Sequence, residues 1–510
     1  MSGDTLTRLQ GPRMQIAVAT TAILALAYAS TFLGPAVIVV AALPLAFWLA
    51  VSFPTIWVLV FLALSQYRIP DAIGPLHSLH LPLAFGAMAL AATVWHVVLA
   101  RTYPASWRRE LVLMLALLAL AAVGLVVALD RPRSQQFLLE SYWKIIAVAF
   151  ALAWIIRREV DFRHVTITTL LSGIVIGLVA NYNKYHGIDL VEGTRVAIGI
   201  AYYSPLADPN DLALILMCPF CFSLAMLVYR PSPLLTALGA VAAAATLTGI
   251  MATQSRGGLL AVVAGLGVVG IHYVRSRNTL LLLLAATAAL LFLAMGIGGR
   301  QSGGFAELQE SGLDQSSYLR TLAWTAAINM GLDRPYTGVG IAGFPSAFYF
   351  YTPEWVQRDL APHSTWFGIL GEMGFVGLLV LVTMIARAMV TVQTAKTTLD
   401  TLGGSVQMRA FALGLKGSLV TFCVGGTFLG QHVTWPLYTI VALVVALGIF
   451  AETHAREVLG SSPPGWWRPD RTRRGGRRPA ADRTTADPAA ASALRSIPDI
   501  LSRTSLTRHA

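Results

Sequence analysis

The sequence predicts an all-α, polytopic integral membrane protein with 12–14 transmembrane helices. Apolar residues make up 56% of the 510 residues and charged residues only 12%, and the mean hydropathy is +0.65, which excludes a typical soluble domain. Apolar runs of about 18 residues recur along the chain, and in lipid only helices and closed barrels satisfy every backbone polar group. The runs are rich in Leu, Ala and Val and lack the alternation of barrel strands, so helices are predicted.

Fourteen apolar stretches are candidates for membrane spans, and we expect at least twelve to cross. The first three could form three spans, or two spans with a re-entrant segment. In chain order the stretches are 14–32, 35–50, 54–66, 81–100, 111–129, 142–156, 165–180, 212–229, 234–252, 259–274, 280–297, 366–390, 411–429 and 433–451.

Lys and Arg in the short connections predict the orientation, because cytoplasmic loops carry the excess of these residues. Counting all candidates from inside, the basic residues of the inner loops are Arg101, Arg108, Arg109, Arg157, Arg158, Arg163, Arg230, Arg275, Arg277, Lys396 and Arg409. The outer loops carry fewer. Both termini are then cytoplasmic, and the longest polar interruption faces the other side.

The chain is predicted to have three parts: N-terminal spans over 1–180, a second membrane region over 181–451, and a basic tail over 452–510. The tail is rich in Arg, Pro, Ala and Ser without an apolar period, which predicts a disordered cytoplasmic segment that can contact anionic lipid. Much of the net charge of +12 lies in this tail and the short loops. No nucleic-acid-binding motif accompanies it, so nucleic-acid binding is not expected.

The stretch 298–372 is the longest polar interruption, and its large loop covers 298–363. Leu319, Leu322, Ala326 and Met330 recur at helical spacing and predict an amphipathic helix over 318–330, on the membrane surface and ended by the following Gly and Pro residues. The segment PYTGVGIAGF is a glycine-punctuated turn. It is not a phosphate-binding P-loop, because no GK[ST] follows it.

His363 follows a proline at the mouth of the next apolar run. A neutral imidazole there could accept a proton from a hydroxyl. The alternative is a histidine that caps the helix or is hydrogen-bonded within the fold.

Two arginines stand out in the outer connections. Arg195 lies in the polar segment 181–211, where it is either a functional cation or a plain surface charge. Arg256 lies in TQSRGG, wedged between two apolar runs, where a guanidinium needs a polar cavity, a counter-anion or an interfacial position. Its fork of donors suits phosphate, and the two following glycines would allow close approach.

Two further motifs have structural interpretations. In the turn ADPND, Asp208 or Asn210 can cap a helix that begins near Asp211. Cys218 and Cys221 form a CxxC inside an apolar run and are expected to pack rather than bind zinc or exchange disulfides. No metal-ligand motif is present in the sequence, so neither a metal site nor a cofactor is expected.

Four blocks of the second membrane region resemble the O-antigen ligase and polymerase superfamily of bacterial membrane glycosyltransferases. They are LADPNDLAL, TQSRGGLLA, YLRTLAWTAAINMGLDRPYTGVG and PHSTWFGILGEMGFVGLL. The resemblance covers about 181–450 and rests on the order and spacing of the blocks together. It implies that 181–451 is an O-antigen ligase-like catalytic region.

The resemblance implies metal-independent, inverting transfer of a glycan from undecaprenyl diphosphate to a hydroxyl of a glycan, lipid A–core or another acceptor. The site would face the periplasmic side of the bacterial inner membrane, in lipopolysaccharide or other cell-envelope polysaccharide synthesis. His363 would be the general base. Arg195 and Arg256 would bind the diphosphate, and Arg320 would anchor the loop or contact phosphate.

Three alternatives remain beside an O-antigen ligase, and one of them is a structural membrane protein whose polar loops only bind partners. A polymerase of the same superfamily shares these blocks. A transporter of an anionic or lipid-linked solute would explain arginines near the membrane but not a histidine on a large external loop, and no inverted repeat is visible.

Overall fold

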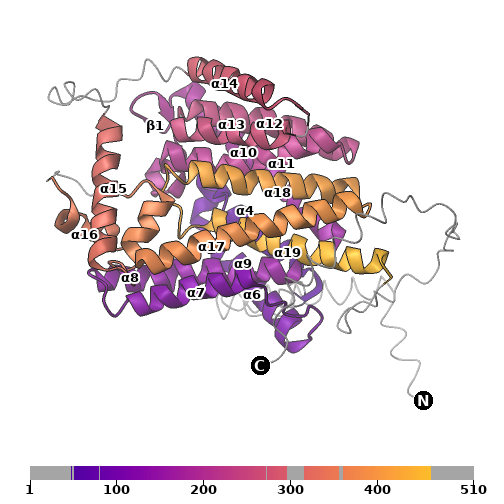
Figure 1. Ribbon diagram of the computed structural model, residues 1–510, viewed down its shortest axis with the longest axis horizontal. Helices are drawn as coiled ribbons and strands as arrows, with labels where there is room; N and C mark the ends of the chain where they lie inside the picture. The colour runs from indigo at the N-terminus through magenta and orange to yellow at the C-terminus, as the bar shows by residue number, and fades with distance from the viewer. Residues whose placement is uncertain are drawn as a thin grey trace, which may run out of the picture. The chain divides into compact units, whose positions relative to one another are not determined.

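The computed structural model describes residues 48, 51–79, 81–271, 273–295, 315–354 and 360–460 (Figure 1). The first predicted span and nearly all of the second therefore lie outside the described residues. So do the start of the large loop and the predicted tail beyond residue 460.

The described chain is almost entirely helical. Its elements are α4 (Pro54–Ser65), α5 (Ile69–Ala72), η2 (Gly74–Leu79), α6 (Leu81–Thr93), η3 (Val94–Leu99), α7 (Arg109–Gly124), α8 (Arg131–Phe137), η4 (Leu138–Tyr142), α9 (Trp143–Ile155), α10 (Glu159–His186), β1 (Leu190–Val191), β2 (Arg195–Val196), η5 (Ile200–Tyr202), η6 (Pro205–Ala207), α11 (Pro209–Tyr229), α12 (Pro233–Ala252), α13 (Arg256–Gly270), α14 (Arg277–Ala294), α15 (Gln315–Asp333), α16 (Phe344–Tyr351), α17 (Thr365–Thr401), α18 (Val406–Gly425) and α19 (Trp435–Val458). The two short strands pair antiparallel, with Leu190 opposite Val196.

The predicted fold class is confirmed. Nine helices of the described residues are long and apolar enough to cross a membrane, and α4 and α13 are shorter apolar helices. Each predicted span from residue 54 onward coincides with a helix. The protein is a multi-pass, all-α membrane protein.

Helix starts follow the local sequence. Asp208 caps α11 by accepting a hydrogen bond from the backbone N–H of Asn210 at 2.6 Å, which confirms the predicted cap, and Pro209 is the first helical residue. The helix begins two residues before the predicted start. Serine side chains cap other helices in the same way: Ser232, Ser255, Ser276 and Ser405.

The core is formed by helices that are far apart in sequence. Figure 1 shows α17, α18 and α19 alongside the helices α10 to α13, and α18 packs closely on α11 and α13. The two glycines after Arg256 serve this packing. A Cβ on Gly257 would lie 3.2 Å from Phe428, and one on Gly258 would lie 3.0 Å from Ala213. The space that the sequence offered to an anion is therefore filled by side chains.

The large loop contains the predicted helix. α15 lies crosswise to the spanning helices at the end where α8 and α16 also lie (Figure 1). Leu322, Ala326 and Met330 are buried on its inner face, as the spacing predicted. The helix continues through Gly331 and ends at Asp333, because a single glycine in a packed helix costs only about 1 kcal/mol.

Helix α17 is broken at Gly374, which has φ 67° and ψ −170°. The large loop docks at this break: the backbone N–H of Phe375 donates to the carbonyl of Pro335 at 2.8 Å, and that of Val339 donates to Gly371 at 2.9 Å. A Cβ on Gly374 would lie 2.4 Å from the Pro335 oxygen. The glycine thus supplies both the left-handed backbone and the close approach.

Helix α19 extends past the predicted start of the tail. It continues through Glu452 to Val458, and both carboxylate oxygens of Glu452 accept hydrogen bonds from Arg108, at 2.5 and 2.7 Å. Residues 452–458 are therefore helical rather than disordered. The change in composition marks the end of the apolar span, and not the end of the helix.

Gly374→Ala should lower the stability more than Gly403→Ala. Gly403 has a similar φ of +69°, but a Cβ there would meet no atom within 4 Å. We expect a loss of about 1 kcal/mol for Gly403→Ala from the left-handed backbone alone, and roughly 2–3 kcal/mol for Gly374→Ala. Thermal unfolding of the two variants in detergent measures the difference. Equal midpoints would contradict a steric role for the Pro335 carbonyl.

Candidate functional site

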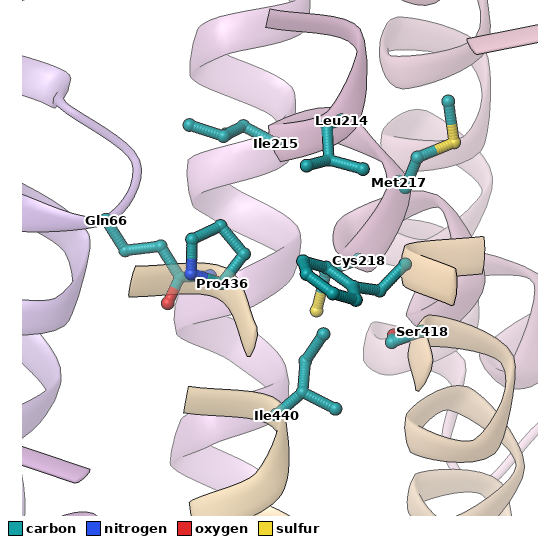
Figure 2. Close-up of a pocket in the computed structure, with 9 residues that line it drawn as sticks. Gln66, Leu214, Ile215, Met217, Cys218, Ser418, Pro436 and Ile440 are labelled. Carbon is teal, nitrogen blue, oxygen red and sulfur yellow. The ribbon is translucent and has the colours of Figure 1, made fainter. Parts of the chain in front are cut away.

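A first cavity lies among the spanning helices and is too small for a substrate. It measures about 10 Å³ and is bordered by Cys218, Ser418 and Ile440 (Figure 2). Such a volume holds at most about one water molecule. Cys218 and Cys221 are buried free thiols, in accordance with their predicted packing role.

A second cavity, of about 320 Å³, lies where the large loop docks on the helices. Its walls come from α8, the turn before α11, the 338–345 segment, the start of α17 and the connection between α18 and α19. The lining residues are Arg133, Phe137, Asp208, Asp211, Ala342, Pro345, Ala361, Pro362, His363, Glu372, Gly430, His432 and Val433. This volume is within the range of small-ligand sites.

His363 lines this cavity just before the first residue of α17. Its φ of +42° is a left-handed conformation that a histidine adopts only when its surroundings hold it. Trp324 of α15 donates to the carbonyl of Pro362 at 3.1 Å, and the hydroxyl of Thr365 donates to the carbonyl of Leu429 at 2.7 Å. His363 thus borders the cavity in a segment that is anchored on both sides.

Glu372 and His432 form a buried pair in the cavity wall. The carboxylate of Glu372 lies 2.9 Å from Nε2 of His432, and the two side chains are 5% and 4% exposed. The same carboxylate accepts the backbone N–H groups of Ala342, at 2.9 Å, and of Phe344, at 3.4 Å. One side chain therefore connects α17, the glycine-punctuated turn and the α18–α19 connection.

The ring of His432 explains a glycine on α17. A Cβ on Gly368 would lie 2.5 Å from Cε1 and 2.7 Å from Nδ1 of His432. Any side chain at position 368 would displace the ring. Gly368 therefore leaves room for the His432 ring in the cavity wall.

The start of α11 contributes two carboxyl groups to the cavity, from the cap residue Asp208 and from Asp211 in the first turn. Asp208 accepts the N–H of Asn210, as described above. Asp211 accepts a hydrogen bond from Nε2 of Gln431 at 2.7 Å. The turn is thereby joined to the connection that carries His432.

Arg195 is buried behind this turn and is not among the lining residues. Its guanidinium donates to Oδ1 of Asn210 at 2.8 Å and to the carbonyl of Thr253 at 3.1 Å, and lies 3.7 Å from Glu192. Ser255 also donates to Oδ1 of Asn210, at 2.8 Å. The structure thus brings the segments of Arg195 and Arg256 together around Asn210.

Arg256 and Arg320 also lie outside the cavity lining. Arg256 is the first residue of α13 and its side chain is exposed. Arg320 is half-buried on α15, one turn before the Trp324 that anchors the His363 segment. Of the four predicted site residues, His363 alone lines the cavity.

Sequence reasoning did not single out Arg133, Glu372 or His432. Glu372 had a signal, because an acid inside an apolar run requires a polar partner. His432 lies between two apolar runs, and Arg133 was counted only as a loop charge. Within the described ranges, no group of three or more His, Cys, Asp or Glu residues could hold a metal ion.

Glu372→Gln should destabilise the protein, because an amide has one acceptor oxygen, whereas both carboxylate oxygens of Glu372 accept hydrogen bonds from N–H donors. We expect a loss of about 1–3 kcal/mol in the free energy of unfolding, measured by thermal unfolding. Asp130→Asn is the control, since Asp130 accepts from the Ser346 hydroxyl and one N–H, and a hydroxyl can reverse its role. A similar loss in both variants would argue against this role of Glu372.

Comparison with protein families gives one match, to the family described as O-antigen ligase, over residues 241–382. The matched range runs from within α12 to within α17 and contains Arg256, Arg320, His363 and Glu372. No curated protein matches the chain. This match supports the resemblance of the second membrane region to the O-antigen ligase and polymerase superfamily.

Proposed function

We propose that this protein transfers a glycan from a polyprenyl diphosphate carrier to an acceptor hydroxyl. The observation that carries the proposal is the position of His363, on the lining of a cavity of about 320 Å³ inside the range of the family match. The family supports an O-antigen ligase-like or polymerase-like enzyme, with a lipid-linked glycan and an acceptor as its partners.

His363 would act as the general base. Its neutral imidazole takes the proton from the acceptor hydroxyl as the oxygen attacks the anomeric carbon of the donor glycan. The bond between that carbon and the diphosphate oxygen breaks, and its electron pair leaves with the diphosphate. The proton remains on His363 until solvent removes it. Direct displacement of this kind inverts the anomeric configuration.

The predicted arginines would stabilise the leaving diphosphate, which accumulates negative charge as the bond breaks. Arg256, exposed beside the Asn210 turn, suits direct contact. Arg195 already donates to Asn210 and Thr253, so its contribution would include holding the turn that carries Asp208 and Asp211. Arg320 would anchor the large loop or contact phosphate.

We infer that the cavity faces the periplasmic side of the bacterial inner membrane. The family and the apolar helices support a multi-pass membrane protein. The basic residues concentrate in the connections on the opposite side, such as Arg101, Arg108 and Arg109, which favours a cytoplasmic location for them.

His363→Ala should abolish most of the transfer. Loss of a general base costs about 10²- to 10⁴-fold in rate. The measurement is glycan transfer in membranes at matched expression, with His186→Ala as the control. His186 is exposed at the end of α10 and does not line the cavity. Normal product with His363→Ala would remove the catalytic assignment and favour transport of a lipid-linked solute.

Product analysis in a deletion strain separates a ligase from a polymerase. If the protein is a ligase, its loss removes all attached polymer, and undecaprenyl-linked glycan accumulates. If it is a polymerase, single repeat units remain attached to the acceptor. We expect the ligase pattern, and a ladder reduced to single units would contradict it.

A further inference from the structure

The charged groups of the cavity are unequally paired. Its lining includes three carboxylates, and each accepts a hydrogen bond from the protein: Asp208 from Asn210, Asp211 from Gln431, and Glu372 from His432 and two backbone N–H groups. The three carboxyl groups are thus each engaged by donors of the protein itself. Each of these carboxyl groups accepts at least one hydrogen bond from a neighbouring residue of the protein.

Arg133 is the arginine of this lining, and its pairing differs from that of the carboxylates. Its side chain is exposed, and within the described ranges no hydrogen bond or ion pair engages its guanidinium. Its backbone N–H donates to Oδ1 of Asp130 at 3.2 Å, and the charge of its guanidinium is among the causes that lower the pKa of Asp130. A guanidinium carries five donors and a permanent positive charge.

The start of α8 is attached to the large loop, which fixes the backbone from which Arg133 extends. Ser346 donates to the Asp130 carboxylate at 2.6 Å, and the N–H of Leu129 donates to the carbonyl of Val339 at 3.1 Å. The Ser346 hydroxyl, followed by the Arg133 N–H, holds the pKa of Asp130 below its ordinary value. A Cβ on Gly340 would lie 2.6 Å from Ala128, so the two segments are in close contact.

The loop that anchors α8 is also the loop that Glu372 holds. Glu372 accepts from Ala342 and Phe344, in the same segment that contacts Ala128 and Leu129. Arg133 and His363 therefore line the same cavity although they are far apart in the sequence. The loop segment held by Glu372 contacts the chain just before α8, which carries Arg133. By contrast, the guanidinium of Arg195 donates to the carbonyl of Thr253 and to Oδ1 of Asn210.

We propose that Arg133 contacts the diphosphate of the lipid-linked donor in this cavity. This inference rests on the proposed function. A guanidinium fork matches phosphate oxygens in geometry and charge. Beside the proposed base, it would neutralise the charge that develops on the leaving diphosphate. A phosphate group on the acceptor has the same chemistry, and the experiment must separate these two sources.

The test compares Arg133→Gln and Arg133→Lys with Arg131→Gln in the full-length protein. Arg131 is exposed on the same helix, two residues earlier, carries the same charge and does not line the cavity. Transfer is measured with the donor varied at fixed acceptor and with the acceptor varied at fixed donor. Binding of undecaprenyl diphosphate, the carrier without its glycan, is measured separately and does not depend on transfer.

We expect Arg133→Gln to weaken undecaprenyl diphosphate binding and donor kcat/KM about 10- to 100-fold, as for one lost charge-assisted hydrogen bond. Arg133→Lys should retain part of both, and Arg131→Gln should match wild type. An effect confined to the acceptor KM would assign the anion to the acceptor and overturn the donor contact. Equal behaviour of Arg133→Gln and Arg131→Gln would overturn the inference entirely.

The thermal unfolding midpoint of each variant identifies any that fails to fold, and Arg133→Lys then carries the comparison. His363→Ala in the same preparations keeps the two proposals apart. If that variant transfers normally, the proposed function fails whatever Arg133 does. If it is inactive while the Arg133 variants bind carrier as wild type does, only the present inference fails.

Discussion

The buried carboxylate of Glu372 is the interaction on which the candidate site depends. A charged group inside a membrane bundle loses its hydration, and the loss is offset only if hydrogen bonds replace the lost water. Here the replacements come from two backbone N–H groups of the large loop and from the imidazole of His432. The need to satisfy one carboxylate therefore draws three separate segments together. The space left between them is the larger cavity.

The large loop is held by backbone geometry as much as by side chains. Gly374 breaks α17 and allows the Pro335 carbonyl to approach, and Gly338 packs against the backbone at Glu372, where a Cβ would lie 2.4 Å from its carbonyl carbon. These contacts hold the loop tightly against α17. A histidine in a left-handed conformation is tolerated at residue 363 because its neighbours are restrained in this way.

Local signals in the sequence predicted much of the fold and part of the site. Apolar runs located the spans, the spacing of Leu322, Ala326 and Met330 located α15, and the ADPND turn identified the Asp208 cap. The position of His363 at a helix start was equally local. The Glu372–His432 pair and the packing of Gly257 against Phe428 could not be predicted, because each joins segments that only the tertiary fold brings together. For the same reason, the sequence did not distinguish Arg133 from the basic loop residues that set the membrane orientation.

The walls of the cavity have a consequence for how the enzyme is divided into parts. The family match covers 241–382, yet Arg133, Asp208, Asp211 and His432 lie outside that range and come from both sides of it. The range matched by the family comparison is thus smaller than the part of the chain that lines the cavity. A fragment cut at the module boundaries would lose walls on both flanks. For design of truncations or chimaeras, the segments that line the cavity extend from α8 to the α18–α19 connection.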